Sequence, residues 1–130
     1  MKFGYTIVYV SSVVDTLRFY QDAFGFETRL LHESGEYGEL ETGATVLAFA
    51  SHAMGYLNLG GMYQKTDLAD APLGVELAFV ADDVASAYAK ALAAGAVAIK
   101  PPMEKSWGQT VAYVRSLEGS LIEICSHVGG

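Results

Sequence analysis

The chain carries one pattern twice, and this internal repeat constrains its fold more than any other feature. Two short segments, 4–10 and 74–81, are rich in β-branched and aromatic residues and short enough to be strands. Each is followed by apolar residues at helical spacing, over 12–25 in the first half and 83–95 in the second. The two helical segments agree in length to within one residue. We therefore expect two copies of one structural unit.

The residues at the ends of both expected helices are types that favour helix termini. Ser12 is a suitable N-cap for the first helix, and Asp82 or Asp83 is suitable for the second. Gly25 and Gly95 stand where a glycine commonly ends a helix in the left-handed conformation. These residues support the helix boundaries that the spacing predicts.

Strand-like runs separated by turn residues follow each helix. The runs are 26–33, 37–42 and 45–50 in the first half, and 96–99, 109–115 and 120–126 in the second. Turn signals lie between them at 34–35, 42–43, 101–102 and 118–120. The order β-α-β-β-β, present twice, predicts an α+β fold with two tandem βαβββ modules. We expect one domain over 1–130, with curved mixed sheets around a cavity.

The stretch 51–73 connects module one (1–50) to module two (74–130). It is longer than a simple connection between secondary-structure elements, which favours a lid or a binding loop. A partly disordered linker is the alternative.

Composition excludes several classes of protein. A hydrophobic content of 52% is too high for a disordered chain. The apolar runs fall short of the roughly 20 residues that a membrane helix needs, and the N-terminal residues alternate instead of forming the apolar block of a signal peptide. The single cysteine, Cys125, excludes an internal disulfide. We expect a cytoplasmic protein without membrane contact.

The charge balance indicates what the chain binds. The net charge is −7, and the eight basic residues are scattered, whereas nucleic-acid binding needs clustered Lys and Arg. We expect no nucleic-acid partner. An acidic balance favours a cationic ligand where the charges line a cavity. No Gly-x-Gly-x-x-Gly or P-loop motif supports a nucleotide cofactor.

Several short motifs resemble the vicinal oxygen chelate superfamily, which includes the glyoxalase I, bleomycin-resistance and extradiol dioxygenase families. In the first module they are Val-Ser-Ser-Val at 10–13, Phe-Tyr at 19–20 and Phe-Gly-Phe at 24–26. In the second they are Ala-Phe at 78–79, Asp-Asp-Val at 82–84, Gly-Ala at 95–96 and the closing run Glu-Gly-Ser-Leu-Ile-Glu-Ile at 118–124. The resemblance covers nearly the whole chain. It implies the paired-module fold and a homodimer.

The resemblance also implies where a divalent metal would bind. The superfamily's enzymes hold it through His, Gln or Glu in the first strand of each module and a carboxylate in the fourth. The matching positions here are Tyr5, Glu76, Glu123 and Leu47, or Ala48 with a one-residue slip. No imidazole is among them, although zinc and iron sites rely on His nitrogen. We therefore favour no metal cofactor, with Mg²⁺ or Mn²⁺ on Glu76 and Glu123 as the alternative.

Period-two alternation predicts which side chains line the cavity. Tyr5, Tyr9 and Tyr37 form its aromatic walls, and Glu76 and Glu123 supply negative charge. Two carboxylates without a metal would raise the pKa of one of them and form an acid–base pair. An edge position in water is the alternative for Glu76.

Other residues have weaker claims to a site. Trp107 and Gln109 lie at the entry to the predicted strand 109–115 and are candidates for ligand binding, with core packing as the alternative for the indole. For Glu39 and Glu41 we expect a solvated surface. Cys125 is expected to pack in a strand. His52 is expected to have no special role, with membership of a lid beside Met54, Tyr56 and Tyr63 as the alternative.

The leading interpretation is a metal-independent protein that binds a small aromatic or cationic organic molecule. The competing interpretation is a glyoxalase-like lyase or isomerase in which Glu76 and Glu123 hold a metal or transfer protons. An extradiol dioxygenase is disfavoured, because the iron site of that family resembles an arrangement of two His and one carboxylate, and both His positions are absent here.

Overall fold

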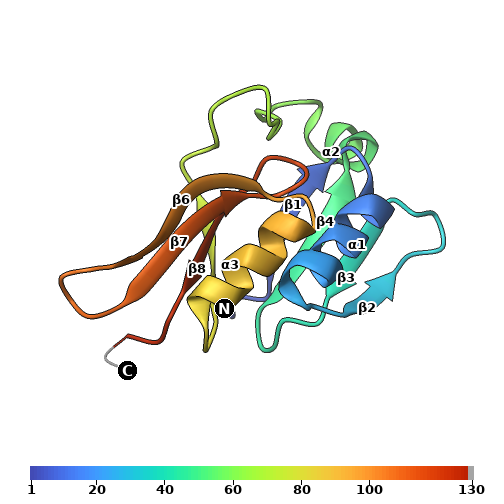
Figure 1. Ribbon diagram of the computed structural model, residues 1–130. Coiled ribbons are helices and arrows are strands. Elements are labelled where there is room, and N and C mark those ends of the chain that lie inside the picture. Colours follow the sequence, from blue (N-terminus) through green and yellow to red (C-terminus); the bar gives the residue numbers. More distant parts are fainter. Residues whose placement is uncertain (129–130) are drawn as a thin grey trace. The chain divides into compact units, whose positions relative to one another are not determined.

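The computed structural model describes residues 1–128 and contains two compact units, Met1–Thr66 and Asp67–Gly130. Figure 1 shows the elements of both. The boundary between the units falls inside the stretch 51–73.

Unit 1 contains one four-stranded sheet and two helices. Its elements are β1 (Tyr5–Val10), α1 (Val13–Phe24), β2 (Thr28–Leu31), β3 (Tyr37–Leu40), β4 (Val46–Ser51) and α2 (His52–Leu59). The strand order is β1-β4-β3-β2, with β1 parallel to β4 and the other pairs antiparallel. We call this sheet A.

Unit 2 repeats the same arrangement. Its elements are β5 (Glu76–Val80), α3 (Val84–Ala93), β6 (Val97–Glu104), β7 (Thr110–Arg115) and β8 (Leu121–Cys125). Sheet B has the order β5-β8-β7-β6, again with one parallel pair, β5 and β8. The predicted α+β class with two βαβββ modules is confirmed.

Helix α1 covers one face of sheet A because its ends and its apolar stripe favour that packing. The Ser12 side chain accepts a hydrogen bond from the Asp15 N–H, and Gly25 ends the helix with φ 79°. The buried Tyr20 ring lies 4.8 Å from the Phe49 ring of β4. On β3, a Cβ added to Gly38 would lie only 2.6 Å from Leu17 Cδ1. Helix α1 leaves the opposite face of sheet A uncovered.

Helix α3 covers one face of sheet B in the same way. Asp83, and not Asp82, is the N-cap, and its carboxylate accepts a hydrogen bond from the Ser86 N–H. Gly95 follows the helix with φ 109°. Alternation along β8 places the buried Ile122 and Ile124 on the face towards α3.

The dipeptide Pro101-Pro102 was expected to form a turn, and this expectation is wrong. Strand β6 continues through both prolines to Glu104. It is an edge strand, so a residue without an N–H need not break a ladder on both sides, and its register against β7 shifts between Lys100 and Met103.

The stretch 51–73 begins with a helix that the sequence pattern did not indicate. Ser51 caps α2 by accepting from the Met54 N–H, and Gly60 ends it with φ 62°. Gly55 in its middle weakens the helical signal. Among residues 1–128, no helix is long and apolar enough to cross a membrane.

Arg115 holds the first residues of unit 2 in place through hydrogen bonds. Its guanidinium is buried and donates hydrogen bonds of 2.7 to 3.4 Å to the backbone carbonyls of Asp67, Leu68, Asp70 and Gly119. Gly119 has φ 100°, and a Cβ there would lie 2.8 Å from the Asp67 carbonyl carbon. The β7–β8 turn therefore packs closely on the segment that begins at Asp67.

Candidate functional site

The face of sheet B opposite α3 carries a cluster of ionisable side chains. Glu123 in β8 is paired in register with Ala78 of β5 and with Tyr113 of β7. Glu76 lies two residues before Ala78, so it shares this face. The expected alternation is confirmed within unit 2, because the residues of β5 on this face are more exposed than Leu77 and Phe79 between them.

A phenol–carboxylate hydrogen bond stands at the centre of this cluster. Tyr113 Oη donates to Glu123 Oε1 over 2.9 Å, and both side chains are half-buried. Burial, the bond to Glu123 and the negative charge of Glu123 raise the pKa of Tyr113 to about 12. The phenol therefore stays protonated at neutral pH and serves as a permanent donor to Glu123. Sequence reasoning missed Tyr113, although its alternation with the buried Ala112 and Val114 marks the same face.

Glu76 is coupled to Glu123. Burial, the negative charge of Glu123 and a hydrogen bond to Glu123 raise the pKa of Glu76 above its ordinary value. Such a pair keeps a proton on Glu76 to higher pH than an isolated carboxyl would. The arrangement is able to attract a cation or to exchange a proton with a bound molecule.

Cys125 lies at the end of the same strand as Glu123. Its side chain is 4% exposed, and burial followed by the neighbouring Glu123 raises the pKa of its thiol. A buried protonated thiol is a poor nucleophile, which agrees with the packing role expected from the sequence.

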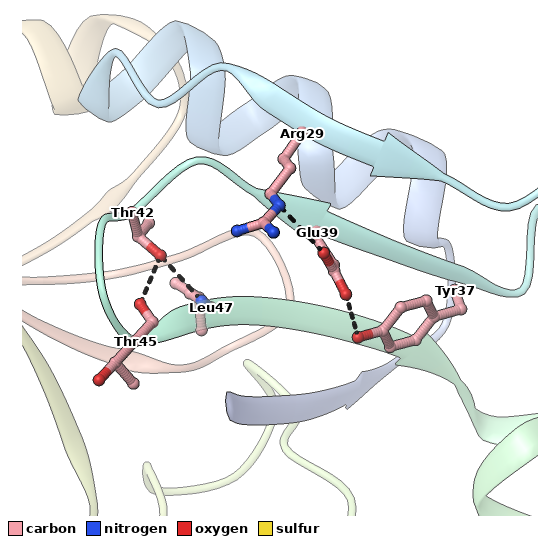
Figure 2. Close-up of polar contacts among 6 residues, drawn as sticks. All are labelled: Arg29, Tyr37, Glu39, Thr42, Thr45 and Leu47. Carbon is pink, nitrogen blue, oxygen red and sulfur yellow. Dashed lines mark hydrogen bonds and ion pairs between the residues drawn. The ribbon is translucent and has the colours of Figure 1, made fainter. Parts of the chain in front are cut away.

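A second polar cluster lies on the corresponding face of sheet A. Tyr37 Oη donates to Glu39 Oε2 over 2.7 Å, and Arg29 Nε lies 3.6 Å from Glu39 Oε1. Figure 2 shows Glu39 between these two side chains. Burial and the bond to Glu39 raise the pKa of the Tyr37 phenol. Tyr37 therefore remains a donor at all ordinary pH values.

The expectation that Glu39 is solvated is wrong. Its side chain is buried, with 8% of the residue exposed, whereas Glu41 is exposed as expected. A buried carboxylate needs partners, and Tyr37 and Arg29 supply them. The sequence placed Tyr37 and Glu39 on one face but gave no sign of Arg29, which lies where the register of β2 against β3 shifts between Thr28 and Leu30.

The placement of Leu47 on the uncovered face needs correction. Leu47 pairs with Thr6 and is 5% exposed on the α1 side, while Ala48 pairs with Ile7 and Glu39 and lies on the uncovered face. The slip arises in the turn before β4. There the Thr42 hydroxyl donates to the Thr45 carbonyl and accepts from the Leu47 N–H, which adds one residue relative to the turn before β8 (Figure 2).

Tyr5 and Tyr9 also lie on the uncovered face of sheet A, in register with Val46 and Ala50. Tyr5 is 56% exposed. Tyr9 stacks on Tyr63, with ring centroids 4.8 Å apart. Two of the predicted aromatic side chains are thus placed on the expected face of unit 1, and their convergence with Glu76 and Glu123 stays a prediction.

Trp107 and Gln109 form a small surface motif in the loop between β6 and β7. Trp107 is 59% exposed, so core packing does not account for it. Its indole N–H donates to Gln109 Oε1 over 2.8 Å, and Gln109 Nε2 donates to the Ser126 carbonyl. The indole ring is held in place and accessible to solvent.

Comparison with known proteins identifies the family. Residues 3–129 match the family model described as a glyoxalase-like domain. The chain belongs to this family. No curated protein matches the chain.

Solved structures agree with the family assignment of this glyoxalase-like domain. A glyoxalase/bleomycin resistance protein/dioxygenase family enzyme from Burkholderia phytofirmans PsJN is 25% identical, with a TM-score of 0.80 over 97% of this chain and 98% of that one. A glyoxalase-related enzyme from Fulvimarina pelagi is 19% identical, with a TM-score of 0.83 over 98% of this chain and 88% of that one. A superfamily member from Sphaerobacter thermophilus DSM 20745 is 18% identical, with a TM-score of 0.72 over 98% of both. The resemblance to the vicinal oxygen chelate superfamily is confirmed.

The positions that match the superfamily's metal ligands carry no imidazole in this chain. The positions that correspond to the superfamily's ligands are Tyr5, Ala48, Glu76 and Glu123, of which only the last two are carboxylates. Within residues 1–128 no group of three or more His, Cys, Asp or Glu side chains is arranged to hold a metal ion. Zinc and iron prefer nitrogen or sulfur donors, so these residues do not fit them.

A groove of about 310 Å³ lies elsewhere in the glyoxalase-like domain. It runs between α1 and β2, and Leu17, Arg18 and Leu31 contribute to its walls. Because Leu17 belongs to the side of sheet A that α1 covers, the groove is separate from the face that carries Tyr5 and Glu39.

Proposed function

We propose that this glyoxalase-like protein binds a small cationic organic molecule without a metal, at the uncovered face of sheet B. The observation that supports this is the coupled pair Glu76 and Glu123, with the Tyr113 phenol bound to the second carboxylate. A cation placed beside the two carboxylates relieves their mutual repulsion. The exposed Ala78 and Val80 next to Glu76 leave apolar surface for the organic part of the ligand.

Calorimetric titration of chelator-treated protein with N,N-dimethylpiperidinium tests the proposal. We expect saturable binding that weakens roughly fivefold in Glu76→Gln, the size of a partly solvated charge interaction. Glu104→Gln removes an equal charge from the exposed end of β6 and serves as the matched control. Absence of binding, or equal loss in both variants, would refute the proposal.

The pH dependence of binding gives a second, independent measure. Because the pKa of Glu76 is raised, a cation should displace the proton that Glu76 retains in the free protein. Affinity should rise with pH from about the ordinary carboxyl range upward, and the rise should disappear in Glu76→Gln. Identical pH profiles for the two proteins would contradict a role for this carboxylate.

The same pair supports a second candidate, a glyoxalase-like isomerase or lyase. A carboxyl whose pKa is raised by burial and by a neighbouring carboxylate, as that of Glu76 is, is suited to proton transfer. Metal-free protein would then catalyse exchange of the hydrogens next to the carbonyl of hydroxyacetone in D₂O. Exchange no faster than that of Glu123→Gln would exclude this candidate while leaving the binding proposal intact.

A further inference from the structure

Glu123 has more acceptor capacity than its phenol partner uses. Ala78 of β5 and Tyr113 of β7 flank it in register, on the face of sheet B that α3 leaves uncovered. Tyr113 Oη donates to Glu123 Oε1 over 2.9 Å. An ionised carboxylate has about four acceptor sites on its two oxygens, and this bond takes one of them. Glu123 is therefore able to accept further hydrogen bonds while Tyr113 holds its side chain in place.

Glu76 lies next to these remaining acceptor sites. It precedes Ala78 by two residues on the edge strand β5, and a hydrogen bond joins its carboxyl to Glu123. Two ionised carboxylates offer acceptors only, so this hydrogen bond needs a proton between them. Burial, the charge of Glu123 and this bond raise the pKa of Glu76. The position between the two carboxyls thus favours a hydrogen-bond donor that carries positive charge.

The neighbouring side chains of unit 2 do not supply such a donor. Arg115 follows Tyr113 by two residues, but its guanidinium donates to backbone carbonyls of Gly119 and of the segment 67–70. The Cys125 thiol bonds to Glu123, but an S–H group is a weak donor without charge. Within the described part of unit 2, no Lys, Arg or His side chain forms an ion pair with either carboxylate. Their charge is left for a bound molecule to neutralise.

We propose that the cationic group bound by this pair is a primary or secondary ammonium whose N–H groups donate to both Glu76 and Glu123. This inference rests on the proposed binding function and names its ligand class. Glu76 is exposed and Glu123 is half-buried, and their carboxyls already approach within hydrogen-bonding distance, so one nitrogen reaches both. A quaternary ammonium brings the same charge but leaves both carboxylates without a donor. Hydrogen bonds between charged partners are also roughly twice as strong as those between neutral ones.

Calorimetric titration with three cations built on the same ring tests this inference. Piperidinium, N-methylpiperidinium and N,N-dimethylpiperidinium each carry one positive charge at neutral pH, and they differ in having two, one and no N–H donors. We expect the affinity of chelator-treated wild-type protein to rise roughly three- to tenfold with each added N–H donor, the net effect of one hydrogen bond to a charged acceptor in a partly solvated site.

Two substitutions of Glu76 separate the hydrogen bond from the charge. Glu76→Gln and Glu76→Leu both remove the negative charge, but only the amide keeps an oxygen that accepts a hydrogen bond. Binding of N,N-dimethylpiperidinium should weaken by roughly fivefold in both. The gain from the second N–H donor should be reduced in Glu76→Gln and absent in Glu76→Leu, because the two N–H bonds of one nitrogen point apart and only one then faces Glu123. Glu104→Gln, the matched control, should leave the ratios of the three affinities unchanged.

The outcomes separate this inference from the proposed function. If the wild-type chain binds none of the three cations, both are overturned. If N,N-dimethylpiperidinium binds and is weakened in Glu76→Gln, but affinity does not rise with the number of N–H donors, the ligand class is overturned and the binding function stands. A rise that persists in full in Glu76→Leu also overturns the ligand class, because the donors then bind elsewhere. Should Glu76→Leu fail to fold, an undiminished rise in Glu76→Gln has the same meaning.

Discussion

Glu39 of β3 occupies the position that Tyr113 occupies in β7. Glu39 pairs with Ala48, and Tyr113 pairs with Glu123, which is the residue equivalent to Ala48 when the two units are aligned on their N-caps. Both units therefore place a phenol–carboxylate hydrogen bond on the face that their helix leaves uncovered, with the two groups supplied by different positions. The same type of contact therefore occurs in both units, but the phenol and the carboxylate stand at different positions of the repeat.

The bond in unit 2 should contribute measurably to stability. Tyr113→Phe removes the hydroxyl that donates to Glu123 and leaves the ring in place. A hydrogen bond to a charged acceptor contributes about 1.5–3 kcal/mol, and partial exposure reduces this to roughly 1 kcal/mol. Urea denaturation measures the change, with Tyr88→Phe in α3 as the control. Equal stability of the two variants would show that the bond contributes nothing.

The bond in unit 1 should matter more, because its carboxylate is buried. Glu39→Gln removes the charge between Tyr37 and Arg29, and we expect a loss of about 2 kcal/mol in the free energy of unfolding. Glu41→Gln, two residues along the chain and exposed, should change it by less than about 0.5 kcal/mol. A similar result for both variants would contradict the buried position of Glu39.

The contrast between Glu39 and Glu41 shows what the sequence was able to predict. Alternation placed the faces of β3, β5 and β8 correctly, because a period of two needs only local information. The burial of Glu39 depends on Arg29, which comes from another strand at a register shift, and no local pattern reveals such a partner. For the same reason, the pairing of Tyr113 with Glu123 was not predicted.

Turn length explains the misplaced Leu47. Leu47 follows Gly43 at the same spacing as Glu123 follows Gly119, and both glycines adopt positive φ in the turns. The Thr42 hydroxyl closes a turn that is one residue longer than its counterpart, so the register of β4 moved from Leu47 to Ala48. A one-residue slip exchanges the two faces of a strand, which makes such errors decisive for site prediction.

Helix α2 was missed because Gly55, which accommodates Tyr63, disrupts the pattern by which helices are recognised.

His52 should titrate below the ordinary range of histidine. Burial and Lys65 lower its pKa from 6.5, so the unfolded chain binds this proton more tightly than the folded one. As pH falls through 6.5, the folded state should lose stability that His52→Gln retains. NMR titration of the imidazole signals, assigned with this variant, measures the midpoint directly. A midpoint at or above 6.5 would refute the assigned environment.

Glu76 should produce the opposite dependence on pH. Its pKa in the folded chain is raised from 4.5, so the folded state holds the proton more tightly than the unfolded state, and stability declines as pH rises above 4.5. Glu76→Gln replaces the carboxyl with an amide, which does not titrate in this pH range. The variant should gain stability relative to the wild-type chain as pH increases towards neutrality, and urea denaturation over that range measures the difference. A constant difference would show that burial and Glu123 do not raise the pKa of Glu76.

Gly119 should tolerate a side chain poorly for two reasons that a matched variant separates. Gly119→Ala introduces strain at φ 100° and brings the new Cβ to 2.8 Å from the Asp67 carbonyl carbon, a backbone atom that Arg115 holds in place. Gly43→Ala has similar strain at φ 92°, but among the described residues no atom beyond its chain neighbours lies within 4 Å of its Cβ. Left-handed strain alone costs about 1–2 kcal/mol, so Gly43→Ala should lose that amount and Gly119→Ala clearly more. Calorimetric unfolding of both variants measures the excess. If Gly119→Ala is no less stable than Gly43→Ala, the close packing of the β7–β8 turn on the segment at Asp67 is wrong.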